Sequence, residues 1–109
     1  MPSSQHERLV EMFRTRGELA PALLELCGVH QLPHDRAVPG SIDFSQSMPI
    51  EYRADAVIEL RGRDHRLTAA VVVEVQLRRD VTKRFTWPLY LAALRAAHRC
   101  DVVLLVLTA

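Results

Sequence analysis

The chain has 109 residues, of which 49% are hydrophobic, so it is long enough to form one domain with a buried core. Its formal net charge of +1 provides no overall attraction to nucleic acid or to a membrane surface. No apolar run approaches the ~20 residues of a membrane helix, and the polar N-terminus does not resemble a signal peptide. We therefore expect a cytoplasmic protein with no membrane partner and no small-molecule cofactor.

The N-terminal region shows two helical patterns separated by Gly17. Residues 4–16 combine a serine cap with an apolar stripe, and residues 18–26 continue with leucines at helical spacing. Pro21 suits the first turn of the second helix, and Gly28 suits its C-terminal cap. This spacing predicts two consecutive helices.

The middle of the chain reads as a loop followed by strands. Residues 30–40 are rich in proline and predict a loop, and residues 41–46 predict a short edge strand. Residues 54–60 and 67–77 predict two clear strands, and the polar residues 61–66 predict the turn between them. Because this turn is short, we expect an antiparallel hairpin.

The last part of the chain predicts a helix over 81–98 and a buried strand over 102–107. Pro88 would be tolerated if the helix starts near Thr86, or it would kink a longer helix. The element order indicates an α/β domain with a small mixed sheet. We expect residues 1–109 to form a single domain that is truncated at its C-terminus or covered there by a partner, such as a second copy in a homodimer.

Polar residues interrupt the valine run of the second hairpin strand. Glu74 and Gln76 are two residues apart and therefore point to the same face of a strand. With the turn centred between Asp64 and His65, Asp55 lies opposite Glu74. Directly opposed residues have Cβ atoms roughly 5 Å apart. A slip of the register by one residue would move Asp55 to the other face.

Two carboxylates at that distance repel each other unless one is protonated or a cation lies between them. Mg²⁺ is commonly bound by one or two carboxylates together with waters. A metal site at Asp55 and Glu74, with Gln76 holding a water or a substrate phosphate, is one interpretation. The alternative is a structural salt bridge of these acids with Arg53 or Arg78.

These residues and the element order resemble the PD-(D/E)XK nuclease superfamily, whose core is helix, three strands, helix and strand. More narrowly, the chain resembles the Rpn group of recombination-promoting, transposase-like nucleases. That group pairs a strand aspartate with an acid-x-Gln strand and follows it with a basic helix that carries an aromatic residue. The matching residues are Asp55, Glu74-Val75-Gln76, Lys83, Arg84, Trp87 and Tyr90, and Glu7 stands where the group has an acid near the start of the first helix.

The resemblance implies a restriction-endonuclease-like α/β core and Mg²⁺-dependent cleavage of DNA, linked to recombination or mobile elements. Asp55 and Glu74 would hold Mg²⁺ or another divalent cation, with Glu7 as a further ligand. Asp55, Glu74 and Gln76 would form the catalytic set. The superfamily usually has lysine at the third position, whereas Gln76 carries no charge. Lys83 or Arg84 could supply the missing positive charge from the helix.

A basic segment follows the second hairpin strand, and it would bind the phosphates of the DNA backbone without sequence specificity. Its residues are Arg78, Arg79, Lys83 and Arg84. A solvated turn and helix start is the alternative interpretation of these charges. We expect Trp87 and Tyr90 to pack in the core or an interface rather than to stack on bases.

Several other residues carry structural interpretations. We expect Cys27 and Cys100 to be buried free thiols, because two cysteines in apolar helical contexts do not form a disulfide framework. The five histidines lack metal-ligand spacing, so no zinc site is expected. Asp43 and Glu59 read as surface acids, and Glu11 is a weaker alternative to Glu7 as a ligand.

The sequence leaves three functional hypotheses open. The first is a Mg²⁺-dependent DNA endonuclease. The second is a catalytically inactive relative that acts as a nucleic-acid-binding or protein-interaction module, and Gln76 is the residue that keeps it open. The third is a fragment of a larger enzyme.

Overall fold

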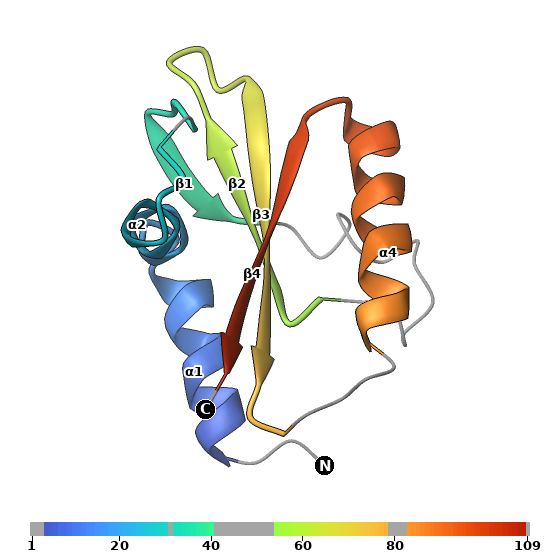
Figure 1. The fold of residues 1–109 in the computed structure, drawn as a ribbon. Coiled ribbons are helices and arrows are strands. Elements are labelled where there is room, and N and C mark those ends of the chain that lie inside the picture. The colour runs from blue at the N-terminus through green and yellow to red at the C-terminus, as the bar shows by residue number, and fades with distance from the viewer. Residues whose placement is uncertain (1–3, 31, 41–53, 79–82, 109) are drawn as a thin grey trace.

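A computed structural model describes residues 4–30, 32–40, 54–78 and 83–108. These residues form a small α/β domain with three helices and a four-stranded mixed sheet, as predicted from the order of the elements (Figure 1). The elements are α1 (Ser4–Thr15), α2 (Leu19–Leu26), β1 (Arg36–Pro39), β2 (Ala56–Arg61), β3 (Leu67–Gln76), α4 (Lys83–His98) and β4 (Asp101–Thr108). No helix in these stretches is long and apolar enough to cross a membrane.

The sheet has the strand order β1-β2-β3-β4. β1, β2 and β3 pair antiparallel, and β4 pairs parallel to β3 after the chain passes through α4. Val71, Val72 and Val73 are fully buried, because β3 is an inner strand with helices on both of its faces. The continuous valine run thus marks the centre of the sheet.

The β2–β3 hairpin has the predicted register. Ala56 pairs with Val73, and one irregularity lies between Leu60 and Arg61 at the turn end. The turn is closed by the backbone N–H of Arg66, which donates to Oδ1 of Asp64 at 3.0 Å. The polar sequence between the strands therefore builds the turn that sets the register.

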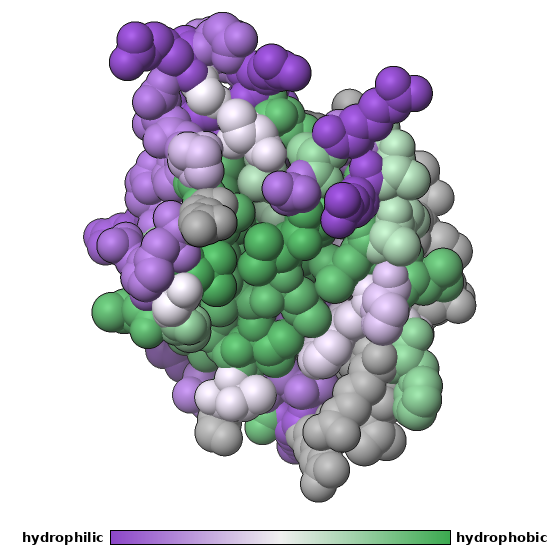
Figure 2. Space-filling model, turned by 45° about the horizontal axis from the view of Figure 1, so that its top comes forward, coloured by the Kyte–Doolittle hydropathy of each residue, from purple (hydrophilic) through white to green (hydrophobic). Residues whose placement is uncertain are grey.

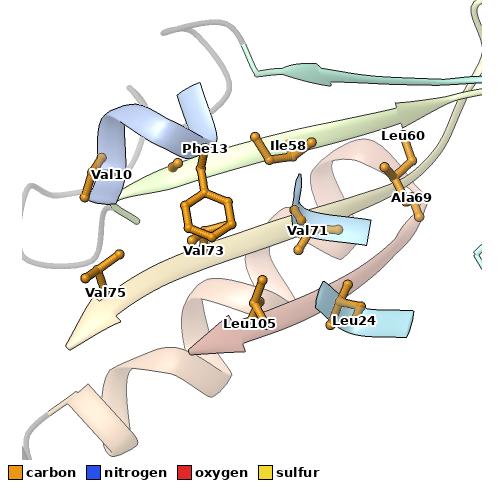
Figure 3. Packing of buried hydrophobic residues seen from close by; sticks show 12 residues of the cluster. Val10, Phe13, Leu24, Ile58, Leu60, Ala69, Val71, Val73, Val75 and Leu105 are labelled. Atoms are coloured by element: carbon orange, nitrogen blue, oxygen red, sulfur yellow. The ribbon is translucent and has the colours of Figure 1, made fainter. Parts of the chain in front are cut away.

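Two apolar layers sandwich the sheet. On one face, Val10 and Phe13 of α1 pack against side chains of β3 that include Val73 and Val75 (Figure 3). On the other face, α4 packs on the alternate residues of β3 through Tyr90 and other apolar side chains. This alternation follows from the period of two along a strand, and it assigns every β3 side chain to one face.

The two N-terminal helices match the prediction, and the glycines around them have distinct roles. A Cβ atom at Gly17 would lie 2.2 Å from the carbonyl oxygen of Ala37, so the chain between α1 and α2 can approach β1 only with glycine there. Gly28 has φ of +92° directly after Cys27, the C-cap of α2, which confirms the predicted C-terminal cap.

Two predictions about the middle of the chain were wrong. The stretch predicted as a loop over 30–40 contains β1, an edge strand that exists because it pairs with β2 from Arg36↔Arg61 to Pro39↔Ile58. Glu59 was predicted to be a surface acid, but it is buried and forms an ion pair with Arg61 at 2.7 Å. The strand predicted over 41–46 and residues 81–82 of the predicted last helix lie outside the described residues.

The two cysteines differ in their surroundings, which corrects the expectation that both are buried. Cys27 is exposed, because it caps the free end of α2, whereas Cys100 is buried. Burial raises the pKa of the Cys100 thiol, and the charges of Asp101 and Glu59 raise it further. Cys100 is therefore both shielded and less often a thiolate at neutral pH.

We expect a thiol reagent at neutral pH to modify one cysteine per folded chain rapidly, at Cys27. Cys100 should react at a comparable rate only after denaturation. Peptide mass spectrometry of the labelled protein measures both rates, and Cys27→Ser should leave only the slow reaction. Equal rates for the two thiols in the folded protein would contradict the burial of Cys100.

Candidate functional site

The residues predicted to form a site come from the β2–β3 hairpin, α1 and α4 and from the residues next to them, and these parts of the chain meet at one end of the sheet. The hairpin brings the start of β2 beside the end of β3. The first turn of α1 and the first turn of α4 lie at the same end, the lower end in Figure 1. A site here is therefore assembled by the sheet and both helix layers.

Asp55 is held at the margin of the sheet, one residue before β2 begins. Its Oδ2 accepts the backbone N–H of Val75 at 2.8 Å. If the β2–β3 register continued, residue 54 would lie opposite Val75, but the chain bends at Asp55 and the carboxylate takes the place of the missing strand carbonyl. The carboxylate therefore lies near the plane of the sheet, beyond the end of β2.

Two side chains of α1 contact Asp55. His6 Nε2 lies 3.3 Å from Oδ2 of Asp55, and the guanidinium of Arg14 donates to the backbone carbonyl of Asp55 at 2.8 Å. With the bond from Val75, these contacts fix the position of an acid whose side chain remains 21% exposed. Asp55 is thus fixed in place and still open to solvent.

Glu74 is a buried acid on the inner strand β3, with only 5% of its surface exposed. Extension of the β2–β3 register places it opposite Asp55, as predicted. Because Val73 and Val75 face α1, the side chain of Glu74 points to the α4 face of the sheet. Burial of an ionised carboxylate is costly without compensation. The salt-bridge alternative stays a prediction, since Arg53 lies outside the described residues.

A pocket of about 440 Å³ opens beside Asp55 on the α1 side. It is lined by His6, Glu7, Val10, Glu11, Arg14 and Asp55. Glu7 and Glu11 are exposed on its rim, so the first-helix acids do share a pocket with Asp55. They lie on the face opposite to that of Glu74, because α1 packs on the side of Val73 and Val75.

The structure therefore divides the predicted metal ligands. By extension of the register Asp55 lies opposite Glu74 on the neighbouring strand, whereas Glu7 lines a pocket with Asp55 on the α1 side. Among the described residues, no three His, Cys, Asp or Glu side chains surround a point that could hold a metal ion. Mg²⁺ commonly takes one or two carboxylates and completes its shell with waters. That Asp55 and Glu74 hold such an ion therefore stays a prediction.

Gln76 ends β3 two residues after Glu74, so both side chains share the α4 face. It is half-buried and pairs with Thr108 of β4. Tyr90 is buried in the α4 core, which fits the predicted packing role, and Trp87 is half-buried.

The predicted DNA-binding residues are described only in part. Arg78 is exposed two residues after the end of β3, the end that lies beside the start of β2 and Asp55. Lys83 and Arg84 begin α4, but their side chains, like the whole of Arg79, lie outside the described part of the structure.

His6 and Arg14 were not singled out as site residues from the sequence. The histidines were tested only for metal-ligand spacing, and Arg14 reads as an ordinary basic residue in the last turn of a helix. Their position on α1 could have indicated their role, because His6 precedes the buried Val10 by four residues and Arg14 follows it by four. Residues at that spacing share one side of a helix, so both could have been expected near the sheet.

No family model matches the chain, and no curated protein or solved structure matches it either.

Proposed function

We propose that this domain is a metal-dependent DNA endonuclease of the PD-(D/E)XK type, with Asp55 and Glu74 as its metal ligands. The observation that carries the proposal is the placement of two acids side by side. Glu74 is buried on the inner strand β3, and Asp55 is fixed one residue before the start of the neighbouring strand β2. The element order helix, three strands, helix and strand supports it, with α2 as an addition to that core.

In this proposal each residue around the site has a defined task. Val75 and His6 hold the carboxylate of Asp55, and Glu74 supplies the second oxygen ligand. Gln76 hydrogen-bonds the attacking water or a phosphate oxygen from the face that it shares with Glu74. A bound divalent cation would lower the pKa of a coordinated water and polarise the phosphoryl oxygen.

The remaining predicted site residues have supporting tasks. Glu7 binds the cation through a water molecule from the α1 pocket, which it lines together with Asp55. Arg78, which is exposed beyond the end of β3, contacts the DNA backbone together with Arg79, Lys83 and Arg84. Cytoplasmic action on recombining or mobile DNA is the setting in which such an activity would serve.

Nicking of supercoiled plasmid tests the proposal. Purified protein is incubated with plasmid in Mg²⁺, Mn²⁺, Ca²⁺ or EDTA, and relaxed and linear products are separated on a gel. We expect nicking with Mg²⁺ or Mn²⁺ and none with EDTA, because the chemistry needs the cation. Asp55→Asn purified in parallel controls for contaminating nuclease, and nicking that persists in this variant would contradict the assignment.

A second candidate function is a binding module without catalysis. It is favoured by Gln76 at the position where the superfamily usually has lysine, and by the exposed apolar side chains of Phe85 and Leu89 on α4. These two residues are four apart and lie on one side of the helix. DNA binding that survives EDTA, together with no cleavage in any metal, would select this function over the nuclease.

A further inference from the structure

Among the described strands, β1 and β4 form the two edges of the sheet, and they differ in character. β1 has four residues, begins with Arg36 and ends with Pro39. Short length, charge and proline are the devices by which proteins keep an edge strand from pairing with another chain. The β1 edge is therefore protected.

The β4 edge is longer, has no proline and carries a charge only at its first residue, Asp101. β4 has eight residues, and its six inner positions are all valine or leucine. It pairs with β3 from Ala69↔Asp101 to Gln76↔Thr108 without a register shift, so no bulge turns it away. Such a strand presents a row of backbone N–H and C=O groups on its outer side, which is a template for a further strand.

The side chains of β4 support the same conclusion. Five of its six inner residues are only half-buried, and Leu105 alone is buried. Val103 and Leu107 contact the core on the α1 face, and Val102 and Leu104 contact the core on the α4 face. Figure 2, which views the molecule from the side of β4, shows a broad apolar area across the middle of this surface. Apolar area of this kind commonly marks a protein interface.

We infer that two copies of this chain pair antiparallel through β4, so that their sheets join into one continuous sheet. A second copy brings the same unprotected edge, and a twofold axis satisfies both edges in one contact. The only charge in β4 is Asp101, at its first residue. Antiparallel pairing keeps the two Asp101 side chains about 23 Å apart, well beyond the Debye length of about 8 Å.

The area of the joined edges is enough for a specific dimer. An eight-residue strand is about 26 Å long, and the helix layers on both faces give the edge a width of about 20 Å. Two such surfaces together bury roughly 1,000 Å², at the lower end of specific protein interfaces. Because interfaces of this size are typical of weak or transient pairs, we expect a reversible dimer.

The dimer does not depend on the proposed nuclease activity. Each candidate site lies at the Gln76↔Thr108 end of its sheet. Antiparallel pairing of β4 directs the two sites to opposite ends of the joined sheet, so neither site completes the other. Dimerisation and DNA cleavage can therefore fail separately.

Sedimentation velocity from about 1 to 100 µM protein tests the inference. We expect the mass to rise with concentration from the chain mass of 12.4 kDa towards twice that value. Val103→Lys places a charge in the middle of the β4 edge and should keep the protein monomeric. Val38→Lys makes the same change in β1, where Val38 is also half-buried, and should still dimerise.

Hydrogen exchange of the unmodified protein keeps the test valid if Val103→Lys does not fold. Amide exchange in residues 101–108 should slow as the concentration rises, while exchange in residues 36–39 should stay constant. A wild-type protein that remains monomeric at the highest concentration overturns the inference. A folded Val103→Lys variant that still dimerises, or exchange in 101–108 that does not respond to concentration, overturns it as well.

Discussion

Phe13→Ala is expected to lower the free energy of unfolding by about 3–5 kcal/mol. Phe13 is only 1% exposed and lies between α1 and the β2–β3 part of the sheet, where removal of the ring leaves a cavity (Figure 3). Urea denaturation followed by circular dichroism measures the loss. Met12→Ala on the same helix, where the side chain is 47% exposed, should cost less than about 1 kcal/mol.

The same helix supplies His6 and Arg14 to the backbone and carboxylate of Asp55. If Phe13 anchors α1 as the packing indicates, Phe13→Ala should also weaken any cation binding that depends on the position of Asp55. Equal losses of stability in Phe13→Ala and Met12→Ala would contradict the packing of α1 into the core through Phe13.

Hydrophobic periodicity predicted most of the fold, because most of its elements bury side chains in a repeating pattern. The valine run of β3 and the aliphatic run of β4 identified two strands, and the apolar stripe ending at Phe13 identified α1. Gly28 was assigned correctly as a cap, because the end of a helix has a local chemical signal.

The wrong predictions concern features that depend on tertiary contacts, which leave no pattern in the neighbouring sequence. β1 has only four residues and ends at Pro39, so its sequence resembles a loop, and it becomes a strand because it pairs with β2. Glu59 was placed on the surface from its charge, but its burial is compensated by Arg61 two residues along the same strand. Cys27 was misplaced because the sequence does not show that α2 leaves its last turn uncovered.

The candidate site was predictable only as far as the hairpin register reaches. A short turn around Asp64 and His65 was enough to place Asp55 opposite Glu74. The bend at Asp55, which turns its carboxylate towards Val75 and His6, depends on where β2 stops pairing. The separation of Glu7 from Glu74 by the sheet likewise required knowing which face α1 covers.

Asp55→Asn and Glu74→Gln are expected to lower metal-dependent nicking by at least about 100-fold, because even residues that only orient a metal ligand cost 10–100-fold when replaced. Asparagine at position 55 can still accept the N–H of Val75, so the end of the sheet should keep its structure while the charge is lost. Glu7→Gln should cost less than about 10-fold, since an exposed acid on the other face binds at most through water. Glu25→Gln, an exposed acid on α2, is the matched control and should leave nicking unchanged.

Cation binding to the same variants separates a metal site from a structural acid pair. A divalent cation that binds only the folded protein raises its stability by about 1.4–2.7 kcal/mol at 10 to 100 times its dissociation constant. In a domain of this size that is a rise in melting temperature of roughly 6–20 °C. The wild-type protein and Glu25→Gln should show the rise with Mg²⁺ or Mn²⁺, and Asp55→Asn and Glu74→Gln should not. If Glu74→Gln instead unfolds at a lower temperature and keeps its response to the cation, Glu74 stabilises the strand through a neighbouring charge and the metal site does not include it.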